Sequence, residues 1–184
     1  DLILEERVLD LPMREADVAI RMKEPSQADL VRRRLMDVTM RFYASETYLQ
    51  RNGIPARRED FATHRLISQS TASRQVSAGL FWLQPFLAAD HESHLTVNNY
   101  FGILQAVLNG LGIGALPNYV ISDFPQLINV LPEEMSKPIP VYLAYPEELR
   151  QSKRVSAFRD FMIEEIAAFK KRYGEVLPGS QPAA

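Results

Sequence analysis

The run from Val97 to Pro117, VNNYFGILQAVLNGLGIGALP, constrains the fold more than any other stretch of this chain. Its apolar residues recur at three- and four-residue spacing between positions 103 and 111, which predicts a helix over about residues 100–109 with one buried face. Gly110 and Gly112 allow that helix to end without a Cβ penalty, and the apolar stretch after them predicts a strand. With a strand expected before the helix as well, the run predicts a β-α-β unit.

Two asparagines, Asn98 and Asn99, open this helix, and asparagine is a good N-cap because its side-chain oxygen accepts an orphan backbone N–H. In a β-α-β unit, the carboxyl end of the strand and the amino end of the helix border the crevice where ligands usually bind. The backbone N–H groups and the positive end of the helix dipole suit a carboxylate or another anion there. Two interpretations stay open: the asparagines only cap the helix, or the cap also borders a binding site.

Strands and helices are predicted to alternate along the rest of the chain, which indicates an α/β fold with largely parallel sheets. Strands are expected near residues 2–4, 16–20, 30–35, 38–45, 64–68, 80–84, 94–97 and 140–146. Short helices are expected near residues 7–13, 46–53 (capped by Ser45), 55–62 and 118–124. A long amphipathic helix is expected over residues 152–173, with an apolar stripe made by Val155, Phe158, Met162, Ile166 and Phe169.

The composition is that of an ordinary globular chain and excludes several classes of function. Of the 184 residues, 46% are hydrophobic and 24% are charged, and the net charge of −2 argues against direct contact with nucleic acid. The absence of cysteine excludes disulfides, thiolate metal sites and Cys nucleophiles. No apolar run approaches the roughly 18 residues of a membrane span. The chain starts without Met and without a signal-peptide pattern, so we expect a region upstream of Asp1 in the natural protein.

The sequence contains no constellation typical of an enzyme, and we expect no catalytic residues, no metal site and no cofactor. The stretch DHESH, residues 90–94, places two histidines three apart, whereas the zincin pattern has them four apart on a helix. The stretch GLGIG follows a helix instead of preceding one, so it is not a phosphate-binding loop. No G-x-S-x-G nucleophile elbow is present.

Four motifs together resemble the effector-binding domain of LysR-type transcriptional regulators. They are READVAIRM, RFYASETYLQRNGIPARREDFATHRLI, VNNYFGILQAVLNGLGIGALP and PIPVYLAYPEE with SKRVSAFRDFMIEEI after it. They occur in the family's order and spacing and span the chain from Leu2 to about Ile166. The first strand and helix of the family pattern and its winged helix-turn-helix domain are not matched by any part of this sequence.

The resemblance implies an α/β fold with two Rossmann-like lobes joined by two crossover strands, as in type II periplasmic binding proteins. Residues 1–40 and 140–184 would form the first lobe, and residues 41–139 the second. The stretches MRFYAS and PVYLAYP would be the two crossovers. The predicted strands at both places are compatible with this arrangement.

In this family a small, often anionic effector lies between the lobes, and the matching positions here imply the contacts. The implied contacts are Arg21 and Met22 of the first lobe and Ser68, Ser70, Asn98, Asn99, Tyr100 and Phe101 of the second. Arg21 is the expected partner of a carboxylate, because its planar guanidinium binds carboxylates bidentately. Each position also has a plainer interpretation: an exposed or inter-lobe ion pair for Arg21, a loop for the serines, and core packing for Tyr100 and Phe101.

The leading hypothesis is therefore a cytoplasmic effector-sensing domain that acts as a homodimer or homotetramer. It would contact DNA only through a domain absent from this chain, and it would not contact a membrane. A periplasmic-type solute-binding receptor is the alternative, because it shares the two-lobe fold but carries a signal peptide. An enzyme on the same fold is disfavoured because the sequence lacks a catalytic set.

Overall fold

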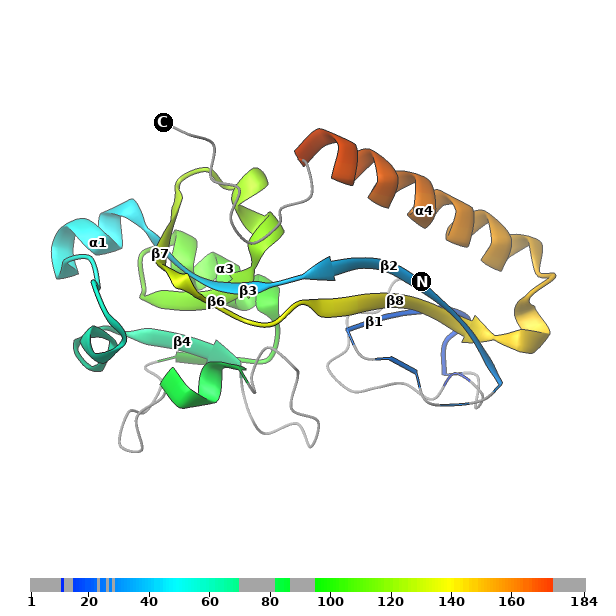
Figure 1. Ribbon diagram of the computed structural model, residues 1–184, viewed down its shortest axis with the longest axis horizontal. Helices are drawn as coiled ribbons and strands as arrows, with labels where there is room; N and C mark the ends of the chain where they lie inside the picture. The colour runs from blue at the N-terminus through cyan, green and yellow to red at the C-terminus, as the bar shows by residue number, and fades with distance from the viewer. Residues whose placement is uncertain are drawn as a thin grey trace. The chain divides into compact units, whose positions relative to one another are not determined.

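The computed structural model describes Leu11 and residues 15–22, 24–25, 27, 29–69, 82–86 and 95–173. The contacts divide the chain into two compact units, which Figure 1 shows coloured along the sequence. As far as they are described, unit 1 comprises Thr39–Lys137, and unit 2 comprises the described residues within 11–38 and 138–173. The chain therefore enters unit 1 between Val38 and Thr39 and leaves it between Lys137 and Pro138.

Unit 1 is built on a mixed sheet, which among the described residues has the strand order β5-β4-β6-β3-β7. The strands are β3 (Met40–Ser45), β4 (Leu66–Gln69), β5 (Leu95–Val97), β6 (Ile113–Pro117) and β7 (Leu127–Met135). β4 pairs in parallel with β5 and β6, whereas β3 is antiparallel to β6 and β7. The carboxyl ends of β4, β5 and β6 and the start of β3 consequently meet at one edge of the sheet, which we call the carboxyl edge.

One face of this sheet is covered by α3 (Tyr100–Leu108), so the predicted helix and the strand after it are confirmed. Ile103 and Val107 are buried and lie over Gly114 of β6, where a Cβ would come within 2.7 Å and 2.6 Å of their Cγ2 atoms. Gly110 has φ 71° and ends the helix as expected. Gly112 has no positive φ; it is required because a Cβ there would collide with the carbonyl oxygen of Arg65.

The other face of the sheet carries an aromatic core around Phe42, since neighbouring residues of β3 point to opposite faces. The Phe42 ring centroid lies 4.7 Å from those of Phe61 and Trp82 and 4.8 Å from that of Phe86. These distances are typical of interacting aromatic pairs, which contribute beyond the area that they bury. The sheet of unit 1 is therefore packed on both faces.

The helix after β3 forms as predicted. In α1 (Glu46–Asn52) the Ser45 Oγ accepts a hydrogen bond from the N–H of Tyr48 at 3.3 Å. Gly53 follows with φ 85°, the left-handed region that glycine enters readily. The next segment is the 3₁₀ helix η1 (Arg58–Thr63), where a short helix was expected.

Unit 2 has a sheet with the order β1-β8-β2 among its described residues. The strands are β1 (Ala19–Arg21), β2 (Leu30–Val38) and β8 (Ile139–Pro146). β8 is antiparallel to both neighbours, so the expectation of largely parallel sheets is wrong for this unit. The reason is topological: β8 is the strand that returns from unit 1, and it enters between two earlier strands that run the opposite way.

The predicted long helix is α4 (Lys153–Tyr173), which runs along β2 (Figure 1). The Lys170 Nζ donates a hydrogen bond to the Leu35 carbonyl oxygen at 3.0 Å. Within the predicted stripe only Val155 is fully buried, whereas Phe158 is 38% exposed. Phe161, on the same flank of the helix as Phe158, is 54% exposed. The buried face of α4 is thus narrower than the spacing of its apolar residues predicts.

One further expectation about strands is wrong, and one strand was not predicted. The segment around Trp82 is helical and continues into the 3₁₀ helix η2 (Gln84–Phe86), because Trp82 and Phe86 turn toward Phe42. The strand that was not predicted is β7, which contains a proline, a residue that is rare inside strands. Pro132 is accommodated by a bulge: Val130 pairs with Phe42, but Met135 pairs with the adjacent Arg41. The remaining short elements are the 3₁₀ helices η3 (Asn118–Ser122) and η4 (Glu147–Leu149).

Several expectations lie outside the described residues. They are the strand near residues 2–4, the helix near residues 7–13, Ser70 and residues 90–94.

Candidate functional site

The carboxyl edge of unit 1 concentrates buried polar side chains. Ser68 and Gln69 end β4 and are 4% and 6% exposed, and Asn118 directly follows β6 and is 5% exposed. Gln69 pairs with Val97 of β5, so the asparagines that follow β5 belong to the same edge. Burying a polar group costs free energy unless the group is hydrogen-bonded. The gathering of three such groups at one edge of the sheet therefore makes this edge the candidate binding site.

Of the two asparagines that precede α3, Asn99 is the one that caps the helix. Its backbone is extended, and its Oδ1 accepts a hydrogen bond from the N–H of Gly102 at 2.7 Å. Its Nδ2 donates to the Oδ1 of Asn98 at 3.0 Å. This bond orients the Asn98 amide: its oxygen is occupied by Asn99, which leaves the Nδ2 hydrogens as the outward donors. Asn98 itself is exposed.

The two aromatic residues at the start of α3 differ in how far their side chains are buried. Tyr100 is half-buried, packs against the core under α3, and lines a cavity of ≈ 10 Å³ together with Gln69 and Met40. Phe101 is 66% exposed, so the interpretation of Phe101 as core packing is wrong. The interpretation of Ser68 as a loop residue is also wrong, because it lies within β4.

Arg21 and Met22 belong to unit 2. Arg21 is the last residue of β1, opposite Tyr142 of β8, and it is half-buried and interacts with neighbouring groups. The structure thus brings Ser68, Asn98, Asn99, Tyr100 and Phe101 to one edge of unit 1, and it places Arg21 and Met22 at a strand end of unit 2. All seven, and Ser70, remain predicted effector contacts.

Gln69 and Asn118 were not among the residues predicted from the sequence. Both directly end or follow a strand of the parallel part of the sheet, which is the signal that would have found them. Their burial, which distinguishes them from ordinary loop residues, becomes visible only in the fold.

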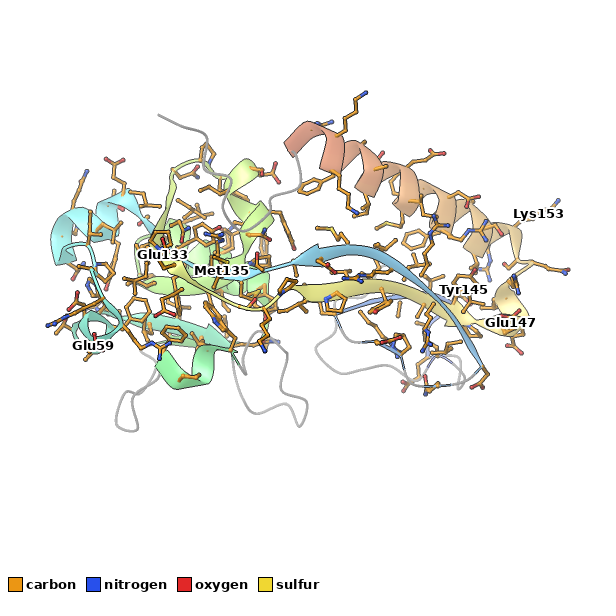
Figure 2. All side chains as sticks on the ribbon, viewed as in Figure 1. Glu59, Glu133, Met135, Tyr145, Glu147 and Lys153 are labelled. Atoms are coloured by element: carbon orange, nitrogen blue, oxygen red, sulfur yellow. The ribbon has the colours of Figure 1, made fainter. Side chains whose placement is uncertain are left out.

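A larger hollow of ≈ 470 Å³ lies between η1 and β7, and Figure 2 labels Glu59 and Glu133 from its two walls. Arg58 closes one side: its Nη2 lies 3.4 Å from the Glu134 Oε2, and its guanidinium carbon lies 4.1 Å from the centre of the Phe86 ring. Arg57 is paired with Asp60 at 3.3 Å. The cations of this hollow are therefore already engaged by carboxylates of the chain, as in a structural ion-pair network.

His64 links η1 to α1 through a buried hydrogen bond. Its Nδ1 lies 3.2 Å from the Tyr48 hydroxyl oxygen, which also accepts the N–H of Arg65 at 2.9 Å. The Tyr48 hydroxyl oxygen keeps a second lone pair after accepting from Arg65, so either Tyr48 or His64 can be the donor in their hydrogen bond. Burial lowers the pKa of His64, opposed by the nearby carboxylate of Asp60.

We expect unit 1 to lose stability as the pH falls below about 6.5, the ordinary pKa of histidine. The pKa of His64 is lowered in the folded state, so the unfolded state binds more protons just below the ordinary pKa and is favoured by acid. The loss is complete once the pH is below the folded-state pKa. Urea unfolding from pH 7.5 to pH 5.0 measures it, and His64→Gln should flatten the slope. The double variant His91→Gln with His94→Gln is the control, and loss of the slope in that variant would contradict the assignment to His64.

Comparison with known proteins decides the family. A model described as the LysR substrate binding domain matches residues 2–167. The chain belongs to the LysR substrate-binding domain family. Its fold class is accordingly the predicted one, an α/β fold of the type II periplasmic-binding-protein kind with two Rossmann-like lobes joined by two crossover strands.

The similar proteins are transcriptional regulators. The chain is 28% identical over 144 residues to an uncharacterized HTH-type transcriptional regulator of Haemophilus influenzae, covering 77% of this chain and 50% of that protein. It is 27% identical over 171 residues to the HTH-type transcriptional regulator CrgA of Neisseria meningitidis, covering 90% of this chain and 56% of CrgA. This LysR substrate-binding domain thus spans about half the length of these relatives.

Solved structures agree with this assignment. The regulatory domain of CrgA, a LysR-type transcriptional regulator, matches with a TM-score of 0.70 and 27% identity, covering 85% of this chain and 78% of that one. The effector domain of AmpR of Pseudomonas aeruginosa matches with a TM-score of 0.65 and 15% identity, covering 91% and 81%. The second likeness shows the fold alone.

Two features are absent from the described residues of this LysR substrate-binding domain. No helix in the described ranges is long and apolar enough to cross a bilayer. The described side chains include no group of three or more His, Cys, Asp or Glu residues placed to hold a metal ion.

Proposed function

We propose that this chain is the effector-sensing part of a LysR-type transcriptional regulator and has no enzymatic activity of its own. The observation that carries the proposal is the family match over residues 2–167, which includes every residue of the polar carboxyl edge. Units 1 and 2 are the two lobes, with boundaries near residues 40 and 139. The effector is a small metabolite that binds between the lobes and favours one of their arrangements, which requires unequal affinity for the two.

The chemistry of the predicted contacts favours an anionic effector. The carboxyl edge of unit 1 offers the Asn98 amide as a donor, and the amino end of α3, where the helix dipole favours negative charge, lies beside it. The predicted contacts from unit 1 carry no charge, so Arg21 of unit 2 is the one cation of the predicted set. A guanidinium on one side and neutral donors on the other suit a carboxylate.

Thermal unfolding with a panel of organic acids tests this proposal. An acid present at 100 times its Kd should add about 2.7 kcal/mol to the free energy of unfolding. The shift should be lost in Arg21→Ala and reduced in Asn98→Leu. Asn98 is preferred to Asn99 for this test, because removing the cap at Asn99 would itself destabilise α3.

Two matched controls accompany these variants. Asn109→Ala alters an exposed asparagine at the other end of α3, and Arg154→Ala alters an arginine of unit 2 whose side chain is 83% exposed. Both should keep the full shift. An undiminished shift in Arg21→Ala and Asn98→Leu would place the effector elsewhere, and the absence of a shift with every acid would contradict an anionic effector.

We further propose a cytoplasmic homodimer or homotetramer that contacts DNA through a separate domain and does not contact a membrane. The relatives are HTH-type regulators of about twice the matched length, and the net charge of −2 gives this chain no general affinity for a nucleic-acid backbone. The coding DNA upstream of Asp1 tests this proposal. We expect a helix-turn-helix segment there, whereas a signal peptide would favour the periplasmic receptor.

A further inference from the structure

The long helix α4 of unit 2 carries an exposed stripe beside the buried face that begins at Val155. Six exposed residues follow one another along α4 at spacings of four, three, four, three and four positions. They are Arg154, Phe158, Phe161, Glu165, Ala168 and Arg172, which we call the outer stripe. This is the heptad spacing by which one helix packs along another helix.

Two phenylalanines form the apolar part of the outer stripe. Phe158 is 38% exposed and Phe161 is 54% exposed, and residues three apart in a helix are neighbours on its surface. A single exposed apolar residue is ordinary in a soluble protein, whereas adjacent exposed rings rimmed by charged residues are typical of an interaction surface. Burial of both rings against another apolar surface would therefore be favourable.

The charges of the outer stripe favour a second copy of the same helix as the partner. Arg154 lies four residues before Phe158, and Glu165 lies four residues after Phe161. A two-fold axis that places Phe158 of one helix against Phe161 of an antiparallel second helix therefore also places Arg154 against Glu165, at both ends of the contact. Such self-complementarity is what a two-fold interface requires. A parallel arrangement would instead oppose each charge to its own kind.

Both charged residues are free to make this contact. The Arg154 Nη2 lies 3.6 Å from the Asp17 Oδ2, but the two side chains are 83% and 60% exposed, and ion pairs so exposed contribute little. Glu165 is exposed and forms no ion pair with another described residue. Exchange of Asp17 for Glu165 of a second copy thus costs Arg154 little.

We propose that the outer stripe of α4 is an interface between two copies of this chain, packed antiparallel about a two-fold axis. The four phenylalanines form its centre, and an Arg154–Glu165 pair closes each end. The inference rests on the homodimer or homotetramer of the proposed function and deepens it by naming the surface. It involves unit 2 alone.

Sedimentation equilibrium of the 184-residue chain tests the interface through charge reversals. We expect the parent to associate. Arg154→Glu and Glu165→Arg each place like charges at both ends of the contact, so each should raise the dissociation constant about tenfold. An equimolar mixture of these two variants has opposite charges at both ends again and should associate as tightly as the parent. This recovery is specific to the antiparallel pairing.

Matched controls lie one residue earlier on the same helix. Lys153→Glu and Glu164→Arg make the same kinds of charge reversal at exposed positions about 100° around α4, outside the outer stripe, and should associate like the parent. Asp17→Asn removes only the partner of Arg154 within its own chain and should not weaken association. Circular dichroism confirms that each variant is folded.

Three results would overturn the proposal. They are a monomeric parent, which would leave the outer stripe to a different partner, association that is insensitive to Arg154→Glu and Glu165→Arg, and a mixture that fails to recover. In the second case the interface lies elsewhere and the proposed homo-oligomer still stands. The reversed residues are outside the predicted effector contacts, so the outcome is also distinct from that of the acid panel.

Discussion

Replacing Phe42 with alanine is expected to lower the free energy of unfolding by about 3–5 kcal/mol, the range for large aromatic truncations in a core. Phe42 is 1% exposed and lies at the centre of the aromatic core of unit 1, with three rings within 4.8 Å of its own. Alanine would leave a cavity that the rigid neighbouring rings fill poorly. Urea unfolding followed by the fluorescence of Trp82, the one tryptophan of the chain, measures the effect.

Phe101→Ala is the matched control for this prediction. It removes the same ring from the same unit, but at a position that is 66% exposed, so the expected change is within about 0.5 kcal/mol. Similar losses in the two variants would show that the aromatic core around Phe42 does not carry the stability of unit 1.

Replacing Gly114 with alanine should cost about 1–3 kcal/mol, because the new methyl group overpacks the contact between β6 and α3. Its Cβ would lie 2.6 Å from the Val107 Cγ2 and 2.7 Å from the Ile103 Cγ2, well inside van der Waals contact. Both neighbours are β-branched residues whose rotamers are restricted in a helix, so the helix itself must shift. Thermal and urea unfolding both report this loss.

Gly102→Ala tests whether the effect belongs to the contact or to glycine as such. Its Cβ would meet Val97 at 3.3 Å, and alanine is favoured over glycine inside a helix by roughly 1 kcal/mol. We expect this variant to be as stable as the parent or slightly more stable. Equal destabilisation in Gly102→Ala and Gly114→Ala would contradict the close approach of α3 to the sheet.

Local chemistry made much of unit 1 predictable from the sequence. The cap at Ser45, the helix end at Gly53 and the helix from Tyr100 follow from side-chain hydrogen bonds and left-handed glycines, which act within a few residues. The segment around Trp82 was mispredicted as a strand, because its conformation is set by contact with Phe42, about forty positions earlier. Propensity cannot register a partner so far away in sequence.

The candidate site was likewise predictable from the sequence only in part. The position of Asn98 and Asn99 at a helix start follows from the spacing, and the structure assigns the cap to Asn99 through its bond to Gly102. The burial of Gln69 and Asn118 could not be read from the sequence, since burial depends on segments that are distant along the chain. The hydrogen bond from the Met40 N–H to the Ser136 Oγ likewise joins residues nearly a hundred positions apart.

The bulge in β7 also bears on how the protein behaves at high concentration. β7 is the outermost strand of the unit 1 sheet as far as it is described, and such strands recruit strands from other molecules when they are long and flat. Here Leu131 has φ 50°, and Pro132 has no N–H to donate, so regular pairing is interrupted after Val130. A strand from another molecule would therefore meet a strand whose regular course is broken at Leu131. This interruption protects that side of the sheet from edge-to-edge aggregation.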